Sequence, residues 1–247
     1  VTLSVPQRGR RRELMEIALK NAREEIVRVE TGREKRLKSL ELFGQMMGLE
    51  HTPEVMEAYD ISNLSGTNTV GSMIVFERAQ PKKNRYRRFK IRSVANGQDD
   101  YQAMEEMLIR RMQRWSDGDE RFSVLPDVFL IDGGLGHVRV AKRVMDRFAC
   151  DRPVFGMVKD DHHRTRGLVA PDGCEFGIAT VPAVFALVGR MQEEVHRFAI
   201  EYQRSLRGSS TMKSQLESIP GVGQKRREQL LRQFKSIAAI RAAGVDQ

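Results

Sequence analysis

Two aspartates lie where the chain is otherwise apolar. Asp60 lies inside a predicted strand, and Asp132 directly follows the apolar run at 128–131. A carboxylate in such surroundings costs free energy unless it is paired or binds a cation. Ligands of open α/β sheets gather at the carboxyl ends of strands, and carboxylates suit hard cations such as Mg²⁺ or Mn²⁺. The pattern therefore fits a divalent metal site, whereas a helix cap at Asp132 and a strand-end turn at Asp60 are the alternatives.

His196 is a further candidate for this chemistry. It lies in the middle of a predicted helix, between acidic and basic neighbours. It could be a solvated helix histidine, a metal ligand or a proton-transfer group near neutral pH. His162 and His163 have neither Cys neighbours nor the i, i+4 helical spacing of a zinc motif, so the sequence predicts no zinc site there.

Basic residues give the chain an affinity for polyanions. It carries 42 Lys and Arg against 33 Asp and Glu, for a net charge of +9. Such an excess favours nucleic acid, although a generally basic surface is the simpler interpretation. Seven of the eleven residues at 82–92 are basic, among them Arg87 and Arg88. One face of this strand would offer cations to phosphates, or the charges would protect an exposed sheet edge.

Residues 216–227 have the pattern of a helix-hairpin-helix motif. Gly221 and Gly223 permit close approach of the backbone to a phosphate, and the amides that begin the second helix can bind it. Lys225 and Arg226 add positive charge. Such a motif binds DNA backbones without reading their sequence, whereas a purely structural helical hairpin is the alternative.

The elements that must position these residues predict an α/β fold. Apolar spacing predicts helices over 10–43, 101–115, 136–148 and 182–207, and strands over 55–62, 69–78, 85–94, 128–131 and 153–158. Residues 160–180 read as loop or hairpin. The order predicts a mixed sheet flanked by helices. We expect a helical arm and linker at 1–52, the sheet domain at 53–207, a Gly-Ser-Ser-Thr linker at 208–211 and a small helical unit at 212–247.

Composition excludes several other classes. The apolar stretches are far shorter than the roughly 18–20 residues that span a bilayer, so no membrane association is expected. The arginines near residue 10 precede an amphipathic helix rather than the apolar region of a signal peptide. Only two cysteines, Cys150 and Cys174, occur, which indicates a reducing cytoplasm. Because the first residue is Val, we expect the chain to be a piece of a longer protein.

Several motifs in a fixed order resemble the UvrC family, the nuclease subunit of the bacterial excinuclease of nucleotide excision repair. They cover nearly the whole chain and lie at 59–63, 75–76, 86–91, 99–101, 126–136, 196–200 and 219–223. The resemblance implies an RNase H-like endonuclease domain followed by helix-hairpin-helix motifs. It also implies a 5′ incision in damaged double-stranded DNA, with UvrA and UvrB as partners. In the family a GIY-YIG domain and a UvrB-binding segment precede residue 1, and a second hairpin follows Gln247.

The resemblance also assigns residues. It implies that Asp60 and Asp132 bind Mg²⁺ or Mn²⁺ and that His196 is the third active-site residue. Asp100 matches another acid that the family needs for this incision, in a catalytic or structural role. Lys159 matches a lysine near the site, where it could contact DNA. Gln192 departs from the family, which usually has a cation at this place.

Two rival functions remain beside a nuclease. A DNA-binding scaffold without catalysis would be favoured by loss of either strand acid, and both acids are present. An RNA-processing enzyme is disfavoured by the helix-hairpin-helix pattern and by the lack of an aromatic platform on which bases could stack.

Overall fold

The computed structural model describes residues 8–64, 68–93, 99–159, 165–217, 219, 223–234 and 237–243. Within these ranges eight strands form one mixed sheet. They are β1 (Val55–Leu64), β2 (Asn68–Glu77), β3 (Gln80–Pro81), β4 (Arg87–Lys90), β5 (Val128–Ile131), β6 (Val154–Lys159), β7 (Thr165–Val169) and β8 (Glu175–Gly177). The order is β3-β2-β1-β5-β6-β7-β8, and β4 also pairs with β2. β1, β5 and β6 are mutually parallel, and the other pairings are antiparallel. The predicted mixed α/β sheet is confirmed.

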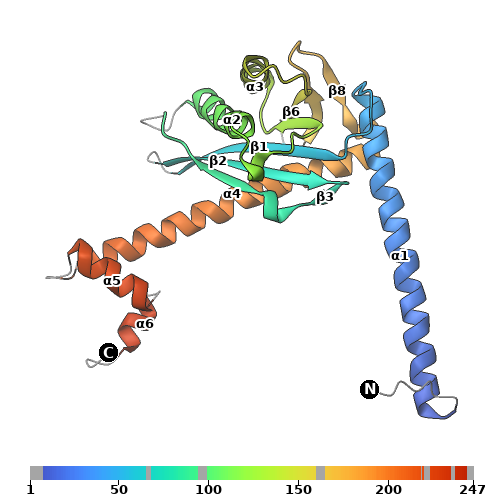
Figure 1. Ribbon diagram of the computed structural model, residues 1–247, viewed down its shortest axis with the longest axis horizontal. Coiled ribbons are helices and arrows are strands. Elements are labelled where there is room, and N and C mark those ends of the chain that lie inside the picture. Colours follow the sequence, from blue (N-terminus) through green and yellow to red (C-terminus); the bar gives the residue numbers. More distant parts are fainter. Residues whose placement is uncertain are drawn as a thin grey trace.

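Helices cover both faces of this sheet (Figure 1). The helices in the described ranges are α1 (Arg10–Met46), α2 (Asp100–Ser116), α3 (Leu135–Arg147), α4 (Pro182–Glu217), α5 (Gln224–Phe234) and α6 (Ile237–Ala242). Of these, α5 and α6 lie beyond the end of α4, away from the sheet (Figure 1). The cores of α2 and α3 pack on one face, and α4 with the last turns of α1 packs on the other. The β5 strand is buried at all four positions because both of its faces are covered, which explains its unbroken apolar run. No helix in the described ranges is long and apolar enough to cross a membrane.

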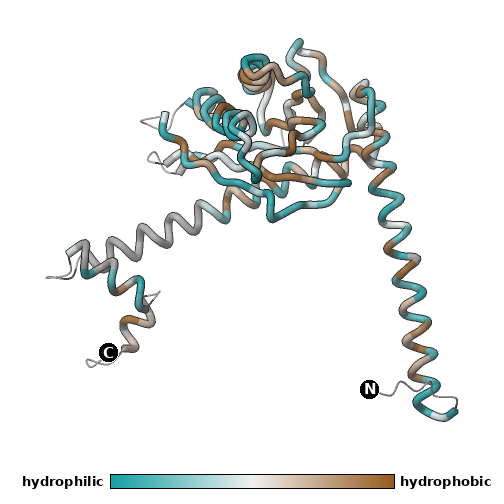
Figure 2. Tube along the Cα trace, in the orientation of Figure 1, coloured by the Kyte–Doolittle hydropathy of each residue, from teal (hydrophilic) through white to brown (hydrophobic). Residues whose placement is uncertain are grey.

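Only the C-terminal part of α1 belongs to the core. Leu40 and Phe43 are buried under the sheet, and the rest of the helix extends away from the body (Figure 1). Apolar side chains such as Ile26 and Val29 therefore stay exposed, as the brown bands along α1 in Figure 2 show. The predicted helical arm is present, but its apolar side chains pack against the rest of the protein only at the C-terminal end of α1.

Three segments differ in detail from their predicted structure. The strand predicted at 85–94 is shorter: Arg85 ends a 3₁₀ turn (Lys83–Arg85), and β4 covers only Arg87–Lys90. The short β3 precedes the predicted range and ends at Pro81, which has no N–H to continue the ladder. Residues 160–180 contain a hairpin formed by β7 and β8, one of the two alternatives. Residues 208–211 are helical within α4, so the irregular linker predicted there is wrong. One glycine costs a helix only about 1 kcal/mol, which cooperative propagation tolerates.

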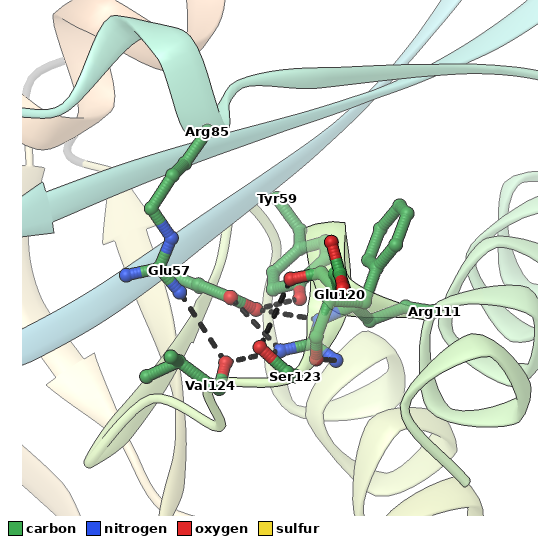
Figure 3. Close-up of polar contacts among 8 residues, drawn as sticks. Glu57, Tyr59, Arg85, Arg111, Glu120, Ser123 and Val124 are labelled. Carbon is green, nitrogen blue, oxygen red and sulfur yellow. Dashed lines mark hydrogen bonds and ion pairs between the residues drawn. The ribbon is translucent and has the colours of Figure 1, made fainter. Parts of the chain in front are cut away.

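A buried ion pair fixes β1 against α2. Arg111 and Glu57 are both essentially unexposed, and two guanidinium nitrogens donate to the Glu57 carboxylate at 3.0 and 3.1 Å (Figure 3). The Tyr59 hydroxyl donates to the same carboxylate, and Arg111 also donates to the carbonyls of Phe122 and Val124. Burial opposes the charge on Arg111, but Glu57 raises the pKa of the guanidinium above its ordinary value. This pair was not predicted from the sequence.

Removing one partner of this pair should destabilise the fold strongly. Arg111→Met leaves the Glu57 charge buried and unpaired, and we expect a loss of about 3–5 kcal/mol in the free energy of unfolding. The double variant Glu57→Gln/Arg111→Met should recover much of this loss, because no buried charge remains and the introduced amide oxygen can still accept from the Tyr59 hydroxyl. Urea unfolding at neutral pH measures both.

The exposed pair of Arg121 and Asp119 serves as the control for this experiment. Arg121→Met should change the free energy of unfolding by less than about 1 kcal/mol. Equal losses in the single and double variants at the buried pair would show that packing, rather than charge, stabilises β1 at this point.

Candidate active site

The two strand acids lie side by side on the parallel strands β1 and β5. Tyr59 and Ile131 are partners in the parallel register, and the Asp132 amide donates to the Tyr59 carbonyl at 2.8 Å. Because side chains alternate along a strand, Asp60 and Asp132 point to the face that α4 covers, opposite to Tyr59. Asp60 is only 6% exposed. The structure therefore brings together the two residues that the sequence singles out, while their roles stay predictions.

The closeness of two carboxylates changes their electrostatics. Burial, followed by the negative charge of Asp132, raises the pKa of Asp60 to about 7. A hydrogen bond from the Ser62 hydroxyl, at 2.8 Å, and the charge of Lys159 oppose this shift. A negative charge on Asp60 therefore costs free energy, and a bound cation would reduce this cost.

Side chains from two other elements hold the Asp132 carboxylate. The Lys159 ammonium, at the end of β6, lies 3.0 Å from both carboxylate oxygens. Gln192 of α4 donates its amide to Oδ1 at 2.9 Å and is itself buried. Lys159 therefore lies at the site, as the resemblance implies, and Gln192 contacts the acid directly. From the sequence alone, Gln192 stands out only as a departure from the family.

Close packing fixes the turn that follows Asp132. A Cβ atom on Gly156 of β6 would lie 2.4 Å from the carbonyl oxygen of Gly133 and 2.5 Å from Val138. The neighbouring strand can therefore approach this turn only because residue 156 is glycine. The contact seats the Asp132 backbone next to β6, where Lys159 can reach the carboxylate.

His196 lies on α4, one turn beyond Gln192 and on the same side of the helix. His196 is exposed, and within the described ranges no hydrogen bond or ion pair joins it to either acid. Likewise, in the part of the chain that the structure describes, no group of three or more His, Cys, Asp or Glu side chains is arranged around a common point for a metal ion. The structure thus places the two acids side by side, whereas His196 lies on α4, the helix that covers this face of the sheet.

Asp100 is tied to β1 by a chain of hydrogen bonds. It accepts from the Asn63 amide at 2.7 Å, and Thr69 donates to the Asn63 carbonyl at 2.8 Å. It belongs to the first turn of α2, whose N-cap is Asp99. Its position fits a structural role at the margin of the site, one of the two roles that the sequence left open.

His137 is a neighbour of the site that the sequence analysis missed. Its ring lies 4.5 Å from that of Tyr101, centre to centre, in the first helical turns after the Asp132 strand. Burial lowers its pKa, and the charges of Asp100 and Asp132 act in the opposite direction. Its place directly after the glycine turn at 133–136 is the signal that could have identified it.

The residues predicted to bind DNA are distributed over several surfaces. Arg88 stacks on Phe198 of α4, with 4.1 Å between guanidinium carbon and ring centre. Arg87 points to the other face of β4 and lies 5.5 Å from the Phe122 ring. The two arginines therefore lie on opposite faces of β4, and their binding to DNA stays a prediction. Alternation along the strand explains this.

The predicted hairpin is partly described. Gly223 is exposed and immediately precedes α5, whose first turn contains Lys225 and the exposed Arg226. Gly221 lies outside the described residues, as do His162 and His163. α4 ends at Glu217 and α5 begins at Gln224, and the role of this segment in binding DNA stays a prediction.

Comparison with known proteins places this site in a family. The family model described as the UvrC RNase H endonuclease domain matches residues 44–200. The UvrABC system protein C of Acetivibrio thermocellus is 42% identical over 98% of this chain and 41% of its own length. That of Clostridium tetani is also 42% identical, over 100% of this chain and 42% of its own. The chain belongs to the UvrC family and contains its RNase H endonuclease domain.

The chain spans about two fifths of the length of these curated relatives. Among solved structures, human ENDOV is similar with a TM-score of 0.41 and 10% identity, over 63% of this chain and 86% of that one. This structural likeness is weak. The fold class therefore rests on the sheet itself and on the family.

Asp60 should make the stability of the fold depend on pH. Because its pKa is raised from 3.8 to about 7, the folded state binds a proton that the unfolded chain has released. This contribution is fully present below about pH 4 and is lost as the pH rises through 7. Without divalent cations, we expect the free energy of unfolding to fall by about 2 kcal/mol more between pH 5 and pH 8 in the wild type than in Asp60→Asn.

Urea unfolding in a chelating buffer measures this difference. Asp146→Asn, on the outer surface of α3, should retain the wild-type pH dependence. An Asp60→Asn variant that loses stability as steeply as the wild type would assign the titration to another group.

Proposed function

We propose that this chain is the part of a bacterial nucleotide excision repair endonuclease that makes the 5′ incision in the damaged DNA strand. The pairing of Asp60 and Asp132 within a UvrC RNase H endonuclease domain carries this proposal. Damaged double-stranded DNA is the substrate, UvrA and UvrB are the partners, and the cytoplasm is the place of action. The net charge of +9 favours such a polyanion.

The donors at this site suit a divalent cation. Asp60 and Asp132 offer carboxylate oxygens, the ligands that Mg²⁺ and Mn²⁺ prefer. The raised pKa of Asp60 reflects burial and repulsion between the acids, which a cation between them would relieve. Asp60 and Asp132 would hold the ion, with His196 of α4 as third ligand. When bound, such an ion supplies charge neutralisation at the scissile phosphate and a more acidic water.

The chain's own residues prepare this site. Lys159 and Gln192 hold the Asp132 carboxylate from two directions, so its oxygens have a fixed orientation before DNA arrives. Ser62 does the same for Asp60. Hydrolysis attaches a water oxygen to phosphorus and breaks the bond to the 3′ oxygen of the preceding nucleotide, which leaves with a proton. His196 would move a proton if it is not a ligand.

Replacing either strand acid should abolish incision and preserve DNA binding. Asp60→Asn and Asp132→Asn keep the shape of the side chain and remove its charge, so we expect at least about a hundredfold loss of 5′ incision. His196→Ala should also cut the rate severely. The assay uses the full-length protein containing this chain, with UvrA and UvrB, on a damaged duplex already nicked on the 3′ side of the lesion.

Asp146→Asn is the matched acidic control and should cut at the wild-type rate. A second measurement is independent of activity: Mg²⁺ or Mn²⁺ should raise the melting temperature of the wild type but not of Asp132→Asn. Efficient cutting by both acid variants in Mn²⁺ would refute the metal-ligand assignment.

The hairpin should control binding rather than chemistry. No atom of the described chain lies within 4 Å of a Cβ atom built on Gly223, so Gly223→Val fits without an internal clash. A bulky side chain would instead obstruct a phosphate. We expect weaker binding to duplexes of every sequence, because phosphate contacts carry no base information. Fluorescence anisotropy measures this binding affinity.

Wild-type affinity in Gly223→Val would show that the hairpin is structural. Replacing Lys225 and Arg226 with Ala should reduce the salt dependence of binding, by about one unit of log–log slope for each phosphate that is no longer neutralised. The cleavage rate at saturating DNA should stay at the wild-type value in both variants.

A further inference from the structure

Three arginines surround a small surface cavity between α1 and the β2–β3 turn. Its volume is about 150 Å³, and it is lined by Arg33, Arg36, Leu37, Arg78 and Gln80. Arg33 and Arg36 are three residues apart on α1, so they share one side of the helix. The cavity is separate from the paired acids, and the sequence analysis did not indicate it.

The turn that presents Arg78 has an uncommon backbone. Arg78 and Ala79 both have positive φ, 51° and 58°, in the two-residue connection between β2 and β3. Such turns favour Asn and Gly because other residues are strained there. Ala79 is buried in the core next to α1, and the Arg78 amide donates to the Glu54 carbonyl at 2.7 Å. The turn thus holds the Arg78 backbone in place and directs this residue to the cavity.

The cavity has more positive charge than its partners neutralise. Arg78 lies 3.3 Å from the Glu54 carboxylate, and both side chains are largely exposed. The Gln80 amide, with its oxygen toward Arg36, accepts from two guanidinium nitrogens at 3.2 Å but brings no charge. Within the described ranges, neither Arg33 nor Arg36 has a carboxylate at ion-pair distance. Like charges held together in this way favour an anion between them.

Guanidinium groups select the kind of anion. Their planar donor pairs match phosphate oxygens and give geometric specificity that ammonium groups lack. Arg33 is exposed, so the cavity is open to a phosphate that is part of a long polymer. We infer that Arg33, Arg36 and Arg78 bind a backbone phosphate of duplex DNA, at a site apart from both the catalytic acids and the hairpin.

The position of the cavity fits the proposed function, on which this inference rests. Glu77 pairs with Val55, the first residue of β1, so Arg78 lies just beyond the start of this strand. Asp60 lies five residues further along β1 than Val55. At about 3.3 Å per residue, the cavity is roughly 15–20 Å along the strand direction from the acids. This span equals about five base pairs of B-DNA. A duplex that is cut at the acids and lies along β1 would therefore pass within reach of the arginines.

The test is DNA binding by Arg33→Gln/Arg78→Gln as a function of salt. Arg36 is left in place because it contacts Gln80 and so supports the docking of α1. One phosphate is no longer neutralised, so the slope of log K against log [salt] should become shallower by about one, and affinity near physiological salt should fall about tenfold. The control Lys20→Gln/Lys35→Gln removes the same charge from other faces of α1 and should retain the wild-type slope.

Each result has a defined meaning. If the arginine variant and the lysine control give the same slope, the phosphate site is refuted. If ³¹P NMR shows that inorganic phosphate binds the wild type but not the arginine variant, while the DNA slope is unchanged, the ligand is free phosphate and the assignment to DNA is overturned. Cleavage at saturating DNA should be unchanged in the arginine variant. If the proposed function is wrong, Asp132→Asn will still cut DNA, and this outcome does not depend on the salt slope of the arginine variant.

Discussion

The parallel pairing of β1 with β5 is the constraint on which the site depends. It places two carboxylates on one buried face, where burial and the charge of Asp132 raise the pKa of Asp60. Three elements reduce this cost: β6 supplies Lys159, α4 supplies the Gln192 amide and β1 itself supplies the Ser62 hydroxyl. A fold shaped only for stability would place an apolar pair here. The retained repulsion therefore supports the proposal that a divalent cation binds between the acids.

The opposite face of β1 explains how this repulsion is tolerated. Three residues before Asp60, Glu57 points the other way into the buried pair with Arg111 (Figure 3). This pair and the bonds of Arg111 to two carbonyls near residue 123 join β1, α2 and the segment before β5. A shift of β1 by one residue would bury Asp60 among the α2 side chains and direct Glu57 toward α4. The ion pair thus fixes the register that the paired acids require.

Local patterns in the sequence predicted much of this architecture. The apolar run of β5 and its terminal acid indicated the strand and Asp132, because a strand buried on both faces leaves an unmistakable pattern. Long-range contacts were not predictable in this way. Arg111 lies within the apolar face of α2, between Leu108 and Met112, but its ion-pair partner is on a strand 54 residues away. Gln192 and His137 likewise become site residues only through the packing of α4 and α3 on the sheet. The prediction of a linker at 208–211 was wrong because it rested on the conformational preferences of single residues. Helix formation is cooperative, so α4 continues through these residues.

That continuous helix relates cutting to binding. α4 contacts Asp132 through Gln192, carries His196 one turn later and continues as helix to Glu217, where the predicted hairpin begins. At 1.5 Å per residue, the backbone from His196 to Glu217 spans about 32 Å. A flexible linker would let a DNA-binding hairpin sample many distances from the acids. A helix across 208–211 instead sets one distance, so a duplex gripped at the hairpin would meet the paired acids at a defined number of base pairs. Under the proposed function, the position of the cut would depend on the length of this helix rather than on base recognition.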